Sequence, residues 1–200
     1  MDSANLSAGE DYPTVLGLRN LNDSANAVSN RAVRLNPLSR RMLSALANDR
    51  AAPLDTVRRR CDVLKRVYPA GGVGCETSIL LRQGKRAEAI ALSRQFADTS
   101  GRCAVRLGFA RLLLNLGDTV SARQEMAKVA DAYSREYIRE DRIATTYYDI
   151  GDTERSIEWW AKAGNSNSSQ IVLLANGEQF AKLRKDPRVQ AILKKAGAIK

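Results

Sequence analysis

A glycine recurs along the chain at nearly constant intervals, and amphipathic stretches flank it each time. The three glycines are Gly84, Gly117 and Gly151, which are 33 and 34 residues apart. On both sides of each glycine, the apolar residues follow the spacing of a helix with one buried face. Glycine adopts positive φ without steric cost, so it often ends a helix in the left-handed conformation. The pattern predicts three helix–turn–helix units in tandem, and a period of this length is typical of helical repeat proteins.

Alignment on the glycines brings other core positions into register. Small residues stand seven positions before the glycine (Thr77, Ala110, Ala144) and five after it (Ala89, Ala122, Ser156). Mostly larger residues stand four positions before it (Leu80, Leu113, Tyr147) and twelve after it (Phe96, Val129, Ala163). Small side chains let the two helices of a unit approach closely, and the larger ones are expected to fill the space between successive units. Asp118 and Asp152 each follow a glycine and are the predicted N-caps of the second helices.

The segments that carry this register resemble the turn and second helix of the tetratricopeptide repeat (TPR) family. They are QGKRAEAIALSRQF, LGDTVSARQEMAKV and IGDTERSIEWWAKA. Upstream, SNRAVRLNPLS is similar to the end of such a repeat, with Pro37 in the place of its terminal proline, and Pro69 repeats that place. The resemblance implies an all-α fold, a right-handed superhelix of antiparallel helix–turn–helix repeats. We expect a single solenoid over residues 1–200, with degenerate repeats over 12–69 and three clearer repeats over 70–164.

The chain departs from the TPR pattern in the first helix of each unit. The family's tryptophan is replaced by Val73, Arg106 and Glu140, and Glu76 stands where later units have an apolar core residue. In the looser unit that Pro69 closes, the predicted core residues are Leu46, Ala47, Cys61 and Leu64. The run GGVG at residues 71–74 lacks the GK[ST] of a phosphate-binding loop, so it is predicted to be a flexible lead into a helix.

The repeat pattern stops after residue 164. The cluster GNSNSSQ predicts a loop, and short helices are predicted over residues 170–174 and 177–184. Asp186 and Pro187 suit the N-cap and first position of a final helix that runs through Lys195. The string FAKLRKDPRVQAILKKAG is similar to a segment that closes many bacterial TPR proteins. That resemblance implies a capping helix whose apolar side covers the end of the last repeat with Val189, Ile192 and Leu193.

The charge balance gives the chain an affinity for anionic partners at low salt. It contains 32 Lys and Arg against 22 acids, a net charge of +10. Basic residues gather at Arg58–Arg60, at Lys65 and Arg66, and in the tail from residue 182. The favoured interpretation of these basic runs is solvated helix faces, and a nucleic-acid groove is less favoured. Grooves that bind single strands usually combine cations with stacking aromatics, and aromatic residues amount to only 6% here.

Candidate chemistry is sparse. The chain has no histidine, and its three cysteines, Cys61, Cys75 and Cys103, lack metal-binding spacing, so no metal or cofactor is predicted. The favoured interpretation of the cysteines is small buried side chains in a reducing compartment. A Cys61–Cys75 or Cys75–Cys103 disulfide remains open if this region faces the periplasm. No nucleotide-binding or nucleophile motif occurs, and the favoured interpretation of Glu154 and Glu158 is a solvated helix face. No catalytic residues are therefore predicted, and the protein is expected not to be an enzyme.

The helix register predicts a concave, partner-binding face made by first-helix residues that point away from the second helix. Its principal residues are Arg41, Asn48, Ser78, Arg82, Arg111, Asn115, Arg142, Thr145 and Tyr148, with Asp149 beside them. Arginine, asparagine and tyrosine bind peptide backbones and carboxylates well. The alternative is that these are ordinary polar surface positions. Trp160 is predicted to lie in the core, and Trp159 to be partly exposed or covered by the capping helix.

These observations favour a non-enzymatic protein–protein interaction module that binds a peptide or partner protein. RLNPLS and the LR-DPR ending resemble the C-terminal repeat region of bacterial winged-helix transcriptional regulators or adenylate cyclases. The resemblance implies a sensory or scaffolding part of a signalling or transcription-regulatory protein. The alternative is a basic solenoid that binds nucleic acid directly. No signal peptide or membrane insertion is predicted, so the expected compartment is the cytoplasm, or the periplasm if the chain is a fragment of a membrane-anchored regulator.

Overall fold

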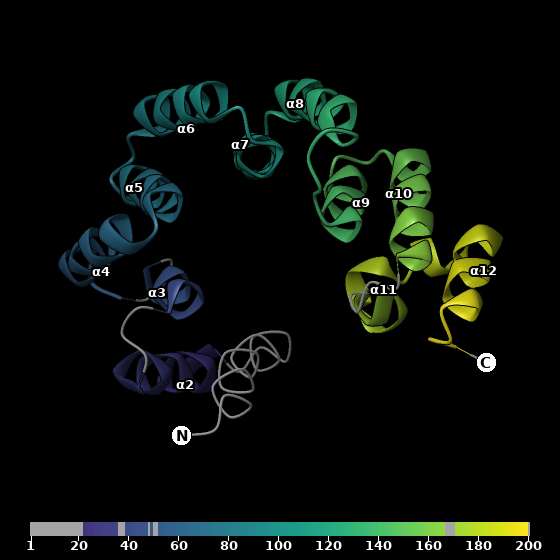
Figure 1. The fold of residues 1–200 in the computed structure, drawn as a ribbon, viewed down its shortest axis with the longest axis horizontal. Coiled ribbons are helices and arrows are strands. Elements are labelled where there is room, and N and C mark those ends of the chain that lie inside the picture. The colour runs from purple at the N-terminus through teal and green to yellow at the C-terminus, as the bar shows by residue number, and fades with distance from the viewer. Residues whose placement is uncertain (1–21, 36–38, 48, 50–51, 167–170, 200) are drawn as a thin grey trace. The chain divides into compact units, whose positions relative to one another are not determined.

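A computed structural model describes residues 22–35, 39–47, 49, 52–166 and 171–199. Within these ranges, helices and turns make up the chain and no strand occurs, which confirms the predicted all-α class. The chain forms two compact units, Met1–Phe96 and Ala97–Lys200. Figure 1 labels their helices. The string SNRAVRLNPLS lies partly outside the described residues, because Pro37 is not among them.

The first unit contains α2 (Asn22–Leu35), α3 (Arg40–Ala47), α4 (Leu54–Val67), α5 (Pro69–Arg82) and most of α6 (Arg86–Ser100). Here α2 packs on α3, α3 on α4 and α4 on α5, and α3 also contacts α5. The four core residues predicted here are buried, and three of them, Ala47, Cys61 and Leu64, belong to a cluster with further buried side chains of this unit. The members of the cluster are Leu43, Ala47, Ala52, Val57, Cys61, Leu64 and Cys75.

Residues 71–74 are helical, so the flexible lead predicted there is wrong. Pro69 occupies the first turn of α5, where the missing N–H costs nothing, and the glycines follow inside the helix. A Cβ on Gly72 would lie 2.3 Å from Cγ and 2.9 Å from Cα of Lys65 on α4. Glycine is therefore needed here because the two helix backbones approach too closely for a side chain.

Cys61 of α4 and Cys75 of α5 form a disulfide with Cα atoms 5.8 Å apart. The favoured interpretation of three free buried cysteines is thus wrong for this pair, and one of the two alternative pairings is present. Cys103 is free and buried, as predicted. The bonded cysteines are 14 residues apart in sequence, on two helices that the single residue Tyr68 joins.

The second unit contains the end of α6, then α7 (Cys103–Asn115), α8 (Thr119–Ala132), α9 (Glu140–Asp149) and α10 (Thr153–Asn165). After residue 170 come α11 (Ile171–Asn176), the 3₁₀ turns η1 (Glu178–Phe180) and η2 (Leu183–Lys185), and α12 (Pro187–Lys195). The helices pair as α7 with α8 and α9 with α10, and α9 also contacts both helices of the preceding pair. The packing of neighbours in sequence is what helix–turn–helix units predict.

The three glycine turns share one geometry. Gly84, Gly117 and Gly151 have φ of 75°, 82° and 85°. In each turn, the amide after the glycine donates to the carbonyl five residues earlier; Asp118 N, for example, lies 2.9 Å from Leu113 O. These bonds satisfy carbonyls that the helix end would leave unpaired. Asp118 and Asp152 accept from backbone amides three residues on, at 3.0 and 3.1 Å, so both predicted N-caps are confirmed.

The small residues of the register are buried where the helices of a pair meet. Ala110 and Ala122 are fully buried, as are Ala144 and Ser156 in the next pair. Tyr147, predicted to fill the space between successive units, is buried on α9 and donates to the carbonyl of Met126 on α8 at 3.2 Å. In the second unit, small residues thus let the helices of a pair approach closely, and the Tyr147 ring fills space between one pair and the next.

The C-terminal helices bear out part of the expectation. Asp186 caps α12, with Pro187 in its first turn, and Val189 and Leu193 are fully buried where α12 packs on α10 and α11. The helix predicted over residues 177–184 is wrong, because η1 and η2 stand there instead.

The two adjacent tryptophans are both buried. Trp160 is 0% exposed, as predicted for the core. Trp159 is only 5% exposed, and Tyr133 covers it edge-on at 4.7 Å between ring centroids, with the Lys162 ammonium 3.8 Å from its ring. Tyr133, which follows α8, and Lys162 of α10 therefore shield Trp159.

Candidate partner-binding face

The polar residues predicted to bind a partner in the second unit lie on α7 and α9, which contact each other. Arg111 and Asn115 are four residues apart on α7, and Arg142, Thr145 and Tyr148 are three apart on α9. Such spacings place each set on one side of its helix. We call these five residues the α7–α9 face. All five carry hydrogen-bond donors, and two are cationic, so the face suits an anionic or carbonyl-rich ligand.

Arg111 has an electrostatic partner within this unit. Asp149, one turn beyond Thr145 on α9, is partly desolvated, and this raises the pKa of its carboxyl; the positive charge of Arg111 acts in the opposite direction. The net shift is upward, so Arg111 does not fully compensate for the loss of water around Asp149. Arg111 itself is half-buried, which lowers the entropy it would lose on holding a ligand.

The other side chains of the α7–α9 face differ in how much binding capacity they retain. Asn115 and Arg142 are exposed. Thr145 donates its hydroxyl to the carbonyl of Asp141 one turn earlier, at 2.8 Å. Its donor is therefore occupied within the helix, and it offers a ligand acceptor capacity and a methyl group.

Tyr148 has a structural role that its position in the register does not reveal. Its hydroxyl donates to the carbonyl of Gln179 at 2.9 Å, and its ring lies 5.2 Å from that of Phe180. Phe180 in turn meets Trp160 edge-on at 5.5 Å. Tyr148 thus anchors the η1 turn to α9, and only the distant residues brought together by folding identify this role.

In the first unit, the predicted face is represented by Ser78 and Arg82 on α5. Ser78 donates to the carbonyl of Gly74 at 3.1 Å, and Arg82 donates to the carbonyl of Ala52, just before α4, at 2.7 Å. Both side chains thus have intrachain partners. Arg41 lies on α3, but its side chain and Asn48 fall outside the described residues.

Arg106, in the place of the family's tryptophan, centres an ion-pair network that pattern analysis did not find. Its guanidinium lies 2.6 Å from the Glu125 carboxylate on α8 and 3.2 Å from that of Asp98 on α6. Burial disfavours the charged form of Glu125, but hydrogen bonds from Lys128 and Arg106 outweigh it, and the pKa of Glu125 lies below its ordinary value. The network joins α6, α7 and α8.

Glu140 occupies the same place in the next unit, and it too is buried and bonded. It accepts hydrogen bonds from the hydroxyls of Tyr133 and Ser166, the latter at 3.3 Å. Burial, together with Glu140, raises the pKa of Tyr133 to about 12. These contacts connect α8, α9 and α10, and they have no signal in sequence because their partners are 7 and 26 residues from Glu140.

A third network lies at the surface. Arg188 of α12 binds both carboxylate oxygens of Glu154 at 2.6 and 2.9 Å, and also pairs with Asp186. The bidentate contact fixes the start of α12 against the start of α10. Glu154 therefore pairs with a helix distant in sequence, and its role is structural.

A scan against family models finds no match for the chain, and no curated protein matches it. Among the described residues, no three metal-ligating side chains come together. No helix in the described ranges combines the length and apolarity needed to cross a membrane.

Proposed function

We propose that this protein is a non-enzymatic TPR-like interaction module that binds a peptide or partner protein through the α7–α9 face. The observation that carries the proposal is a set of three polar side chains, half-buried Arg111 with exposed Asn115 and Arg142, held on two packed helices whose opposite sides form the core. Rigid helices place such side chains more precisely than loops do.

The chemistry of the face favours a partner with a carboxylate. A guanidinium binds a carboxylate through two parallel hydrogen bonds, and an asparagine amide can pair with both the N–H and the carbonyl of a peptide backbone. An acidic side chain or a C-terminal carboxylate of the partner would occupy the position between Arg111 and Arg142.

The broader role we propose is that of a sensory or scaffolding part of a bacterial signalling or transcription-regulatory protein. The support is the resemblance of RLNPLS and the LR-DPR ending to the repeat regions of such regulators. Two residues of that ending have structural roles in the C-terminal region. Arg184 donates to the carbonyl of Leu174 at 3.1 Å, and Asp186 caps α12.

The test is a peptide selection on the full chain, followed by calorimetry with the tightest acidic peptide. Arg111→Glu and Arg142→Glu should each weaken binding at least tenfold, while far-ultraviolet circular dichroism stays unchanged. Arg135→Glu, which reverses an exposed charge in the turn after α8, is the matched control and should bind normally. Normal binding by both face variants would show that the α7–α9 face is not the site.

Direct nucleic-acid binding is the second candidate, favoured by exposed cations on α4. Arg58, Arg59, Lys65 and Arg66 are exposed there, although Arg58 pairs with Asp55 at 3.5 Å and Lys65 with Glu76 at 2.6 Å. Binding of single-stranded RNA or DNA that weakens steeply as salt rises, and that Arg59→Glu reduces, would support it. No binding at low salt would reject it.

A further inference from the structure

The first two turns of α5 are intrinsically poor helix. They contain Gly71, Gly72 and Gly74, and glycine is the least favourable helix residue after proline. Gly71 and Gly72 cannot be replaced without clashes, since a Cβ on Gly71 would lie 2.5 Å from Tyr68 Cδ1 and one on Gly72 would meet Lys65. Close packing on α4 thus demands glycines that weaken the helix making the contact.

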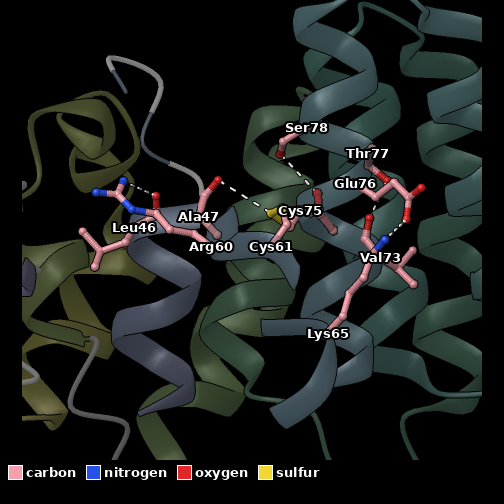
Figure 2. Close-up of a disulfide and its surroundings, with 11 residues drawn as sticks. Leu46, Ala47, Arg60, Cys61, Lys65, Val73, Cys75, Glu76, Thr77 and Ser78 are labelled. Atoms are coloured by element: carbon pink, nitrogen blue, oxygen red, sulfur yellow. Dashed lines mark hydrogen bonds and ion pairs between the residues drawn. A yellow bond between two sulfur atoms is a disulfide. The ribbon is translucent and has the colours of Figure 1, made fainter. Parts of the chain in front are cut away.

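The Cys61–Cys75 disulfide lies directly after this weak stretch. Figure 2 shows the bond between α4 and α5, with Ala47 of α3 facing it. Cys61 and Cys75 are 2% and 0% exposed, and Cys75 Sγ lies 3.8 Å from the carbonyl oxygen of Ala47. The bond therefore fixes α5 to α4 one residue beyond Gly74, at the centre of the first unit's core cluster.

Beside the apolar packing of the core cluster, the polar contact between the same turns is weak. Lys65 and Glu76 form an ion pair at 2.6 Å, but both side chains are more than 40% exposed. Exposed ion pairs of this kind contribute little to stability. Thr77, the next buried position, bonds Ser93 of α6 at 2.9 Å and so does not attach α5 to α4.

We propose that the Cys61–Cys75 disulfide is what keeps the first turns of α5 helical against α4, so that the first unit reaches its native form only in an oxidising environment. The inference is independent of the proposed binding function. Forming the bond removes one hydrogen atom from each thiol, and the two electrons and two protons pass to a disulfide oxidant, which is released as two thiols. A dithiol reductant reverses the step. Cys103 is free and buried on α7 and takes no part.

Hydrogen exchange of the full chain, followed by mass spectrometry, tests this. In protein treated with oxidised glutathione, peptide mapping should show Cys61 linked to Cys75 and Cys103 free. On addition of dithiothreitol, amides over residues 71–79 should exchange about a hundredfold faster, the effect expected when a loop of this length loses its cross-link. Amides of α8 should not change. Three free thiols after oxidation, or equal exchange in both redox states, would overturn the proposal.

Two glycine variants separate helix weakness from other effects of reduction. A Cβ on Gly74 or on Gly108 meets nothing within 4 Å, so Gly74→Ala and Gly108→Ala are sterically free substitutions on α5 and α7. Gly74→Ala should slow exchange of α5 in the reduced protein about fivefold. Gly108→Ala should leave it unchanged. If Gly74→Ala has no effect on the reduced protein, or Gly108→Ala protects α5 as well, the weak-helix argument is refuted.

Discussion

Gly117 and Gly108 offer a comparison in which one substitution should have opposite effects at two sites of the second unit. Gly117 ends α7 with φ of 82°, whereas Gly108 lies within α7 and has no positive φ. An added Cβ meets nothing within 4 Å at either residue, so neither substitution causes a clash. The difference in stability between the two variants should therefore come from backbone conformation alone.

The magnitudes follow from that conformation. Alanine in the left-handed region costs about 1–2 kcal/mol, so Gly117→Ala should lower the free energy of unfolding by that amount. Alanine inside a helix is better than glycine by about 0.5–1 kcal/mol, so Gly108→Ala should raise it. The two variants should therefore differ by about 2 kcal/mol. Gly117→Asn should lose less than Gly117→Ala, because asparagine tolerates the left-handed region better.

Tryptophan fluorescence during urea unfolding is the appropriate assay. Trp159 and Trp160 are the only two tryptophans of the chain, and both lie on α10, so the signal reports the second unit alone. This avoids the assumption that both units unfold together. If Gly117→Ala unfolds at the same urea concentration as Gly108→Ala or above it, the left-handed turn does not stabilise this unit.

Three further outcomes test the buried networks. The pKa of Tyr133 is raised to about 12 from 10.0, so its contribution to the free energy of unfolding should be complete below pH 10 and lost toward pH 12. Phenolate absorbance should show this late titration in the unsubstituted protein and lack it in Tyr133→Phe. A double-mutant cycle of Arg106→Ala and Glu125→Ala should give a coupling energy of about 1–2 kcal/mol in urea unfolding, and additive effects would contradict the network. Ala144→Leu should destabilise the second unit by about 1–3 kcal/mol through overpacking, whereas an unchanged unfolding midpoint would mean that the helices do not meet there.

Local features were predictable where the determining residues are neighbours in sequence. The glycine turns and the caps at Asp118, Asp152 and Asp186 follow from interactions within about five residues, and the structure contains all of them. The all-α class and the buried small residues follow from periodicity, which any helix with one covered face must show. For the binding face, the register assigned residues to helices, and partner capture by these residues stays a prediction.

Long-range contacts decided the remainder. The pattern left the cysteine pairing open and read residues 71–74 as a flexible lead, because neither the bond to Cys61 nor the approach of Lys65 to Gly72 is encoded by local propensity. In the same way, Tyr148 appeared free to bind a partner until Gln179 and Phe180 were brought to it. Turn chemistry and helix periodicity depend on backbone geometry over a few residues, so sequence specifies them; cross-links, close helix contacts and shared donors depend on which distant surfaces meet, and only folding determines that.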